Sequence, residues 1–211
     1  CFHSIGIGDY YSTSLSNFKF IVSFLRESGF SFVGIDDFEL SKARLNKECL
    51  LTFDDGLSST SPAVDFCIDN NIPTHHFLIA SKLLEKNNSF FSPYTVGRYI
   101  DSGFFSIGSH SFSHYDLTAM DIRDVGREIK NSRVALEDAC GVKVDTFSYP
   151  FGSFDASVSD VVKQYYGMGF GIFFKKGFVS PFAIPRVTIS NSLMFSGGLR
   201  AAFALRRYIV S

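Results

Sequence analysis

The sequence of 211 residues predicts an α/β fold, a distorted or incomplete (β/α) barrel with about seven parallel strands. Short apolar runs typical of strands alternate with helical patterns along the chain. Three polar motifs fall where predicted strands end, and the carboxyl ends of the strands of a β/α barrel form one face on which sites are built. The strand count favours an incomplete barrel over a regular one of eight strands, and an open doubly wound sheet is the alternative.

The helices are predicted from apolar residues at helical spacing and from their caps. The first begins after Ser14 and stops at Gly29. Ser61-Pro62 opens the second, and Ser92-Pro93 opens a third that ends near Gly103. A long amphipathic helix covers 118–139, and two more cover 156–166 and 193–209. Strands are predicted between them at 2–5, 30–33, 49–53, 72–79, 104–107, 144–148, 169–173 and 184–189.

The first motif is the Thr52-Phe53-Asp54-Asp55-Gly56 run at the end of an apolar strand. Two adjacent carboxylates repel each other unless a positive group lies between them, and a metal ion would serve. One carboxylate could bind the metal while the other handles protons. Taken alone, the run would be interpreted as a solvated turn.

The second motif is Gly108-Ser109-His110-Ser111-Phe112-Ser113-His114. On a helical turn, histidines four residues apart present both imidazoles on one face, where they can share a divalent cation. Two histidines and one carboxylate leave positions open for water and substrate, as catalytic zinc sites do. The alternative is a pair of surface histidines in a serine-rich loop.

The third motif is Ser148-Tyr149-Pro150-Phe151-Gly152, which follows a predicted strand. Proline stiffens this turn and glycine permits close approach of the backbone, so the loop can direct a backbone N–H at a bound oxyanion. An ordinary strand-to-helix turn would have the same composition.

The composition indicates one compact domain over 1–211. The net charge is −1, and no basic stripe indicates binding to nucleic acid. No apolar run is long enough to span a membrane. The four cysteines, Cys1, Cys49, Cys67 and Cys140, show no metal-finger spacing and are typical of a reducing compartment. We therefore expect a cytoplasmic location, with no prediction of oligomeric state. His75 and His76 lie in an apolar strand pattern, and we expect one buried residue and one polar neighbour.

The three motifs, in this order, resemble those of the NodB-homology polysaccharide deacetylases, carbohydrate esterase family four. The resemblance covers about residues 1–189 and implies metal-dependent removal of acetyl from an N-acetylated sugar on a distorted (β/α) barrel. By position, Asp54 matches the catalytic base, and Asp55, His110 and His114 match the ligands of a divalent metal, for which zinc is favoured. Phe151 matches the residue whose N–H binds the oxyanion, and Tyr149 and Pro150 beside it are predicted to contact substrate.

Two departures from the family pattern bear on function. Many members carry, where Ser148 stands, an arginine that steadies the base. We expect Arg186 either to supply that charge, as one of the residues around the substrate, or to be an ordinary surface arginine. Many also carry a late histidine as general acid, whereas this chain has none after His114. The opening Cys1-Phe2-His3 resembles a permuted branch, which includes poly-N-acetylglucosamine deacetylases, and makes His3 the candidate acid.

Three functions are compatible with these residues. The first is a metal-dependent sugar N-deacetylase. The second is an O-deacetylase or amidohydrolase acting on a nucleotide- or lipid-linked sugar. The third is a non-catalytic carbohydrate-binding relative. The intact Asp54, Asp55, His110 and His114 argue against it, whereas Ser148 and the missing late histidine keep it open.

Overall fold

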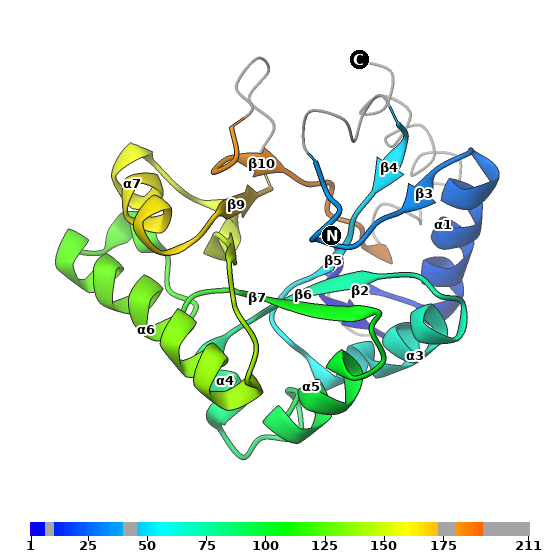
Figure 1. Cartoon of the computed structure of the whole chain (residues 1–211), viewed down its shortest axis with the longest axis horizontal. Coiled ribbons are helices and arrows are strands. Elements are labelled where there is room, and N and C mark those ends of the chain that lie inside the picture. Colours follow the sequence, from blue (N-terminus) through cyan, green and yellow to red (C-terminus); the bar gives the residue numbers. More distant parts are fainter. Residues whose placement is uncertain (7–10, 40–45, 173–179, 192–211) are drawn as a thin grey trace.

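A computed structural model of the chain describes residues 1–6, 11–39, 46–172 and 180–191. Its centre is a parallel sheet of six strands, in the order β10-β9-β8-β7-β6-β5, curled into a half-barrel (Figure 1). The strands are β5 (Leu51–Phe53), β6 (Thr74–Leu78), β7 (Phe105–Ser109), β8 (Thr146–Ser148), β9 (Met168–Gly171) and β10 (Ile184–Pro185). Each strand pairs with the next along the chain, so the predicted barrel is confirmed, with six strands in its main sheet instead of about seven.

Two short parallel pairs accompany this sheet. They are β1 (Ser4–Ile5) with β2 (Ser12–Thr13), and β3 (Ser31–Phe32) with β4 (Glu48–Cys49). The single strand predicted at 49–53 is therefore two strands, because residues 48–49 pair with β3 while residues 51–53 pair with β6. The strand predicted at 2–5 is also divided: Phe2 bridges to Phe53 of β5, whereas Ser4 and Ile5 belong to β1.

The first residues of the chain lie between β5 and the segment that follows β10. Phe2 N–H donates to the Thr52 carbonyl oxygen over 2.9 Å, and Asp54 N–H donates to that of Phe2 over 2.9 Å. On the other side, Ile189 N–H donates to the Cys1 carbonyl oxygen, also over 2.9 Å. The N-terminal segment thus lies beside both the first and the last parts of the sheet, as expected for a permuted strand order.

Helices cover the outside of the sheet (Figure 1). They are α1 (Leu15–Glu27), α3 (Ser61–Asp69), α4 (Ala80–Leu84), α5 (Pro93–Ile100), α6 (Ile122–Cys140) and α7 (Ala156–Tyr165). The cap predicted for the first helix is present, since the Ser14 side chain accepts from Asn17 N–H, and Gly141 ends α6 in the left-handed region at φ 70°. Among the described residues, no helix combines the length and the apolar character that a membrane crossing needs.

Three details of the predicted elements were wrong or lie outside the described residues. The long helix begins at Ile122 instead of residue 118, because Asp121 caps it and a 3₁₀ turn, Leu117–Ala119, precedes it. The sequence did not predict α4, which has only five residues and no side-chain cap. The helix predicted at 193–209 lies outside the described residues.

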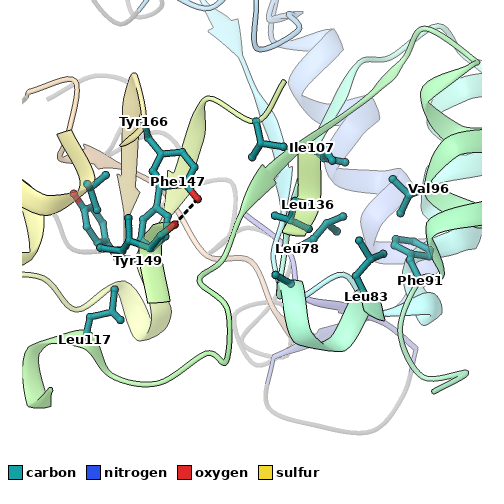
Figure 2. Packing of buried hydrophobic residues seen from close by; sticks show 14 of the residues in the cluster. Leu78, Leu83, Phe91, Val96, Ile107, Leu117, Leu136, Phe147, Tyr149 and Tyr166 are labelled. Carbon is teal, nitrogen blue, oxygen red and sulfur yellow. Dashed lines mark hydrogen bonds between the residues drawn. The ribbon is translucent and has the colours of Figure 1, made fainter. Parts of the chain in front are cut away.

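The largest apolar cluster lies between the sheet and α4, α5, α6 and α7. Figure 2 shows part of it, with Leu78 of β6 near Leu83 of α4, and Phe147 of β8 beside Tyr149 and Tyr166. A second cluster, which includes Phe2, Phe18 and Phe53, joins α1 to β5 and the N-terminal segment. Burial of this apolar surface fixes the strands, and with them the loops at their carboxyl ends.

Candidate metal and catalytic site

The three motifs meet at the carboxyl ends of neighbouring strands. The Asp54-Asp55 pair follows β5, the His110–His114 loop follows β7, and the 3₁₀ turn Pro150–Gly152 follows β8. Asp55 adopts φ 71° and is followed by Gly56 at φ 78°, so the chain turns sharply at the end of β5. This turn lets two adjacent carboxylates reach the same region, which an extended strand would not allow.

Asp55, His110 and His114 form a compact cluster of metal-donor atoms. Asp55 Oδ1 lies 3.6 Å from Nε2 of each histidine, and the two Nε2 atoms are 3.2 Å apart. In a tetrahedral zinc site with bonds of about 2.0–2.1 Å, neighbouring ligand atoms are about 3.3 Å apart. The donor spacing therefore fits one divalent ion.

The protonation of His110 also suits a ligand. Its Nδ1 lies 2.8 Å from the Ser148 carbonyl oxygen, which can only accept, so Nδ1 carries the proton and Nε2 keeps its lone pair. Burial lowers the pKa of His110 to about 3 and lowers that of His114. Both imidazoles are thus neutral near pH 7, the state in which imidazole binds metal.

The histidines do not lie on a helical turn, which corrects the sequence-based expectation. They lie in a loop, with Ser111 at φ 63° and His114 at φ 62°. His114 N–H donates to Ser111 Oγ over 2.9 Å, and this bond brings the second imidazole back towards the first. The positive φ angles are strained for residues other than glycine, so the loop needs support from its surroundings.

Glu128 of α6 supplies part of that support. Its Oε2 accepts from the N–H groups of Phe112 over 3.1 Å and Ser113 over 2.8 Å, both inside the histidine loop. Nothing in the sequence singles out Glu128, because a glutamate on an amphipathic helix is typical of a solvated face.

Asp54 is 1% exposed and is held by Arg186. The two terminal guanidinium nitrogens donate to the two carboxylate oxygens, each over 2.7 Å, and one of them also donates to Ser148 Oγ over 2.7 Å. Burial alone would raise the pKa of Asp54, but the Arg186 guanidinium beside it holds that pKa well below its usual range. The carboxylate is therefore ionised, with Oδ2 3.9 Å from His110 Nε2.

Arg186 thus lies beside the serine that stands where many relatives carry arginine. Its side chain is 6% exposed and is occupied by Asp54 and Ser148. This position suits support of the carboxylate better than contact with a substrate.

His3 lies on the same face of the barrel. One of its ring nitrogens, a carboxylate oxygen of Asp54 and the Cys1 sulfur lie within 4.8 Å of one another. The Phe2 bridge to β5 places His3 next to this strand. The structure therefore brings the candidate acid and the candidate base together.

The third motif is divided between the surface and the core. Phe151 is 57% exposed, adopts φ 58°, and its ring centroid lies 4.7 Å from that of His114. Its N–H belongs to the first turn of a 3₁₀ helix, where an N–H has no acceptor within the helix. Pro150 and Tyr149 are buried, and the Tyr149 hydroxyl donates to the Phe182 carbonyl oxygen over 2.9 Å. The Tyr149 side chain is placed for packing, not for contact with a bound sugar.

Comparison with known proteins agrees with this site. The family model described as polysaccharide deacetylase matches residues 41–168, which include Asp54, Asp55, His110, His114 and Phe151. The chain belongs to the polysaccharide deacetylase family. His3 and Arg186 lie outside the matched range, so their placement rests on the structure.

Two curated relatives illustrate the family. The peptidoglycan-N-acetylglucosamine deacetylase PgdA of Listeria monocytogenes is 30% identical over 126 residues, 59% of this chain and 26% of that protein. A chitooligosaccharide deacetylase of Rhizobium leguminosarum bv. trifolii is 26% identical over 138 residues, 64% of this chain and 57% of that protein. The chain thus spans about a quarter of the length of the first relative and somewhat over half of the length of the second.

A solved structure shows the same fold over nearly the whole chain. IcaB from Ammonifex degensii superimposes with a TM-score of 0.80 at 22% identity, covering 95% of this chain and 94% of that one. The similarity extends beyond the 128 residues of the family match.

Proposed function

We propose that the protein is a metal-dependent hydrolase that removes N-acetyl groups from an N-acetylated sugar or polysaccharide. The observation that carries the proposal is the donor cluster of Asp55, His110 and His114 with the buried, ionised Asp54 at its edge. The names of the two curated relatives support this substrate class, since they describe deacetylases of N-acetylglucosamine in peptidoglycan and of chitooligosaccharide.

Asp55, His110 and His114 would hold the ion, and its donor set of two imidazoles and a carboxylate suits zinc. When bound there, a divalent ion supplies a Lewis acid that polarises the acetyl carbonyl and lowers the pKa of water from 15.7 towards about 7. Asp54 takes the proton from the attacking water as general base, and Arg186 keeps that carboxylate ionised and oriented.

Two steps remain, stabilisation of the oxyanion and protonation of the leaving amine, and Phe151 and His3 are suited to them. Phe151 N–H donates to the oxyanion of the tetrahedral intermediate, and the exposed turn at Phe151 lies open to a substrate. His3 gives a proton to the departing sugar amine, for which its position beside Asp54 is suited.

Acetate release from N-acetylglucosamine oligomers tests the proposal, with metal-free protein compared before and after one equivalent of zinc is restored. We expect activity only with metal. A chain that binds one ion and the oligomers but releases no acetate would be a binding relative. Release only from O-acetylated sugars would contradict N-deacetylation.

A further inference from the structure

A second group of donor atoms lies next to the cluster of Asp55, His110 and His114. It consists of Cys1 Sγ, a ring nitrogen of His3 and a carboxylate oxygen of Asp54, all within 4.8 Å of one another. Cys1 and His3 are partly exposed, so an ion can reach the group from solvent. It shares no residue with the first cluster, although Asp54 and Asp55 are neighbours in sequence.

The backbone that carries this group is fixed. The Cys1 nitrogen donates to the Val187 carbonyl oxygen over 2.7 Å, and Ile189 N–H donates to the Cys1 carbonyl oxygen. His3 Nδ1 is buried and has no hydrogen-bond partner in the described part of the chain. A thiolate, an imidazole and a carboxylate form a ligand set that favours thiophilic ions such as Zn²⁺ over hard ions such as Mg²⁺.

The geometry indicates weaker binding here than at the first cluster. There, donor atoms lie 3.2–3.6 Å apart, close to the spacing that zinc needs, whereas here they are up to 4.8 Å apart. Side chains must therefore rotate to close around an ion. Arg186 also opposes a cation, because its guanidinium is already bound to both oxygens of Asp54.

We propose that Cys1, His3 and Asp54 form a second, weaker site for a thiophilic divalent cation, and that filling this site inhibits the enzyme. Inhibition follows because the cation would occupy the candidate base and the candidate acid together. The inhibitory effect rests on the proposed function, but cation binding to these residues does not.

Cadmium titration of the metal-free protein tests the site without any assay of activity. Cadmium bound to thiolate gives an ultraviolet charge-transfer band, and the first cluster contains no sulfur. We expect the first equivalent to bind without the band and the second to produce it. Cys1→Ser should lose the band and the weaker equivalent, whereas Cys140→Ser, a control at a partly exposed cysteine of α6, should keep both. A band that persists in Cys1→Ser, or no band in the unmodified protein at excess cadmium, would overturn the site.

Zinc inhibition of acetate release tests the consequence. Cys1→Ser should need at least about tenfold more zinc for half-inhibition, since losing even the hydrogen-bonding support of a ligand typically weakens metal binding about 10–100-fold. Equal sensitivity of Cys1→Ser and the unmodified protein would refute the inhibitory role. If every protein lacked deacetylase activity, the proposed function would fail, and the cadmium titration would still decide the site.

Discussion

The molecule holds two pairs of histidines on neighbouring elements, and only one pair has the surroundings of a metal site. His75 and His76 lie on β6, and His110 and His114 lie in the loop after β7. Both pairs are largely shielded from solvent, so burial does not distinguish them. Their partners do.

The pair on β6 is surrounded by hydroxyls and aromatic rings. His75 Nδ1 lies 2.7 Å from Ser106 Oγ, and its Nε2 lies 2.7 Å from Thr146 Oγ1. The His76 ring stacks against Phe53 and Phe105, with centroid distances of 4.6 Å and 4.1 Å. Both residues are buried, which corrects the expectation of one buried and one polar histidine.

The pair after β7 faces carboxylates. One nitrogen of His110 is fixed by a carbonyl oxygen, and the other points towards Asp55 and His114. A free lone pair directed at a second imidazole and a carboxylate is what a cation requires, whereas the hydroxyl partners of His75 already occupy both of its nitrogens. Neighbours, more than residue type, thus distinguish the two pairs.

The largest expected effect follows from this contrast. His110→Ala and His114→Ala should each lose most of the bound metal and reduce acetate release to background, because each removes one of three ligands. His75→Gln is the matched control and should keep one ion per folded chain, as measured by elemental analysis. Full metal retention in both alanine variants would refute the ligand assignment.

Next in size is the effect of replacing Asp54, which should separate the roles of the two carboxylates. Asp54→Asn should lower turnover by about 10²–10⁴-fold or more while metal stays bound, because it removes the base and not a ligand. Asp55→Asn should weaken metal binding itself. The opposite result, with metal lost only from Asp54→Asn, would reverse the two roles.

His3→Ala should lower turnover by about 10²–10⁴-fold with metal retained, the usual contribution of a positioned general acid. The loss should be smaller for activated acetyl esters, whose leaving groups need no proton. Equal losses on amide and activated ester would indicate that His3 only supports the structure.

Glu128 should have a smaller effect, because it acts through the backbone of the histidine loop. Glu128→Ala should weaken metal affinity about 10–100-fold, the usual effect of losing support for a ligand, and Glu128→Gln should restore part of it. Glu137→Ala removes another carboxylate of α6, one that accepts from Arg133 and Val144 N–H away from the loop. Metal affinity reduced equally by the Glu137 and Glu128 changes would point to general destabilisation of α6.

The sequence singles out the proposed metal ligands more readily than the residues that support them. Asp55, His110 and His114 can be found because a short motif contains each of them and each motif follows a strand. Glu128 cannot be found this way, since Ser113, whose N–H it accepts, lies 15 residues away in the chain. Ser148 belongs to the third motif, but the contact of its carbonyl oxygen with His110, 38 residues away, does not follow from that motif. The partner of Arg186 is 132 residues away, so only the closing of the barrel brings it to Asp54.

The boundaries of strands and loops also depend on contacts between residues that are distant in the sequence. The six strands of the main sheet were predicted from apolar runs, but the division of 49–53 into β4 and β5 depends on which strand each half pairs with. The loop conformation of the histidine motif also depends on tertiary contacts, because Ala80 and Ser81 N–H groups donate to the carbonyl oxygens of Ser111 and Phe112. Spacing alone favoured a helical turn.

The smallest expected effect concerns the pH dependence of stability and applies to His75. Burial lowers its pKa from 6.5 to about 3 in the folded protein, so between these values the unfolded chain binds a proton that the folded chain does not. Stability from this group is therefore complete above about pH 6.5 and falls as the pH decreases towards 3. His75→Gln should make the acid-side slope of the unfolding free energy shallower, by at most about 1.4 kcal/mol per pH unit. Urea unfolding of metal-free protein between pH 7 and pH 5 measures this slope, and carboxylates common to both proteins cancel in the difference. An unchanged slope would mean that His75 is protonated in the fold, and the contrast between the two histidine pairs would then have to be drawn on other grounds.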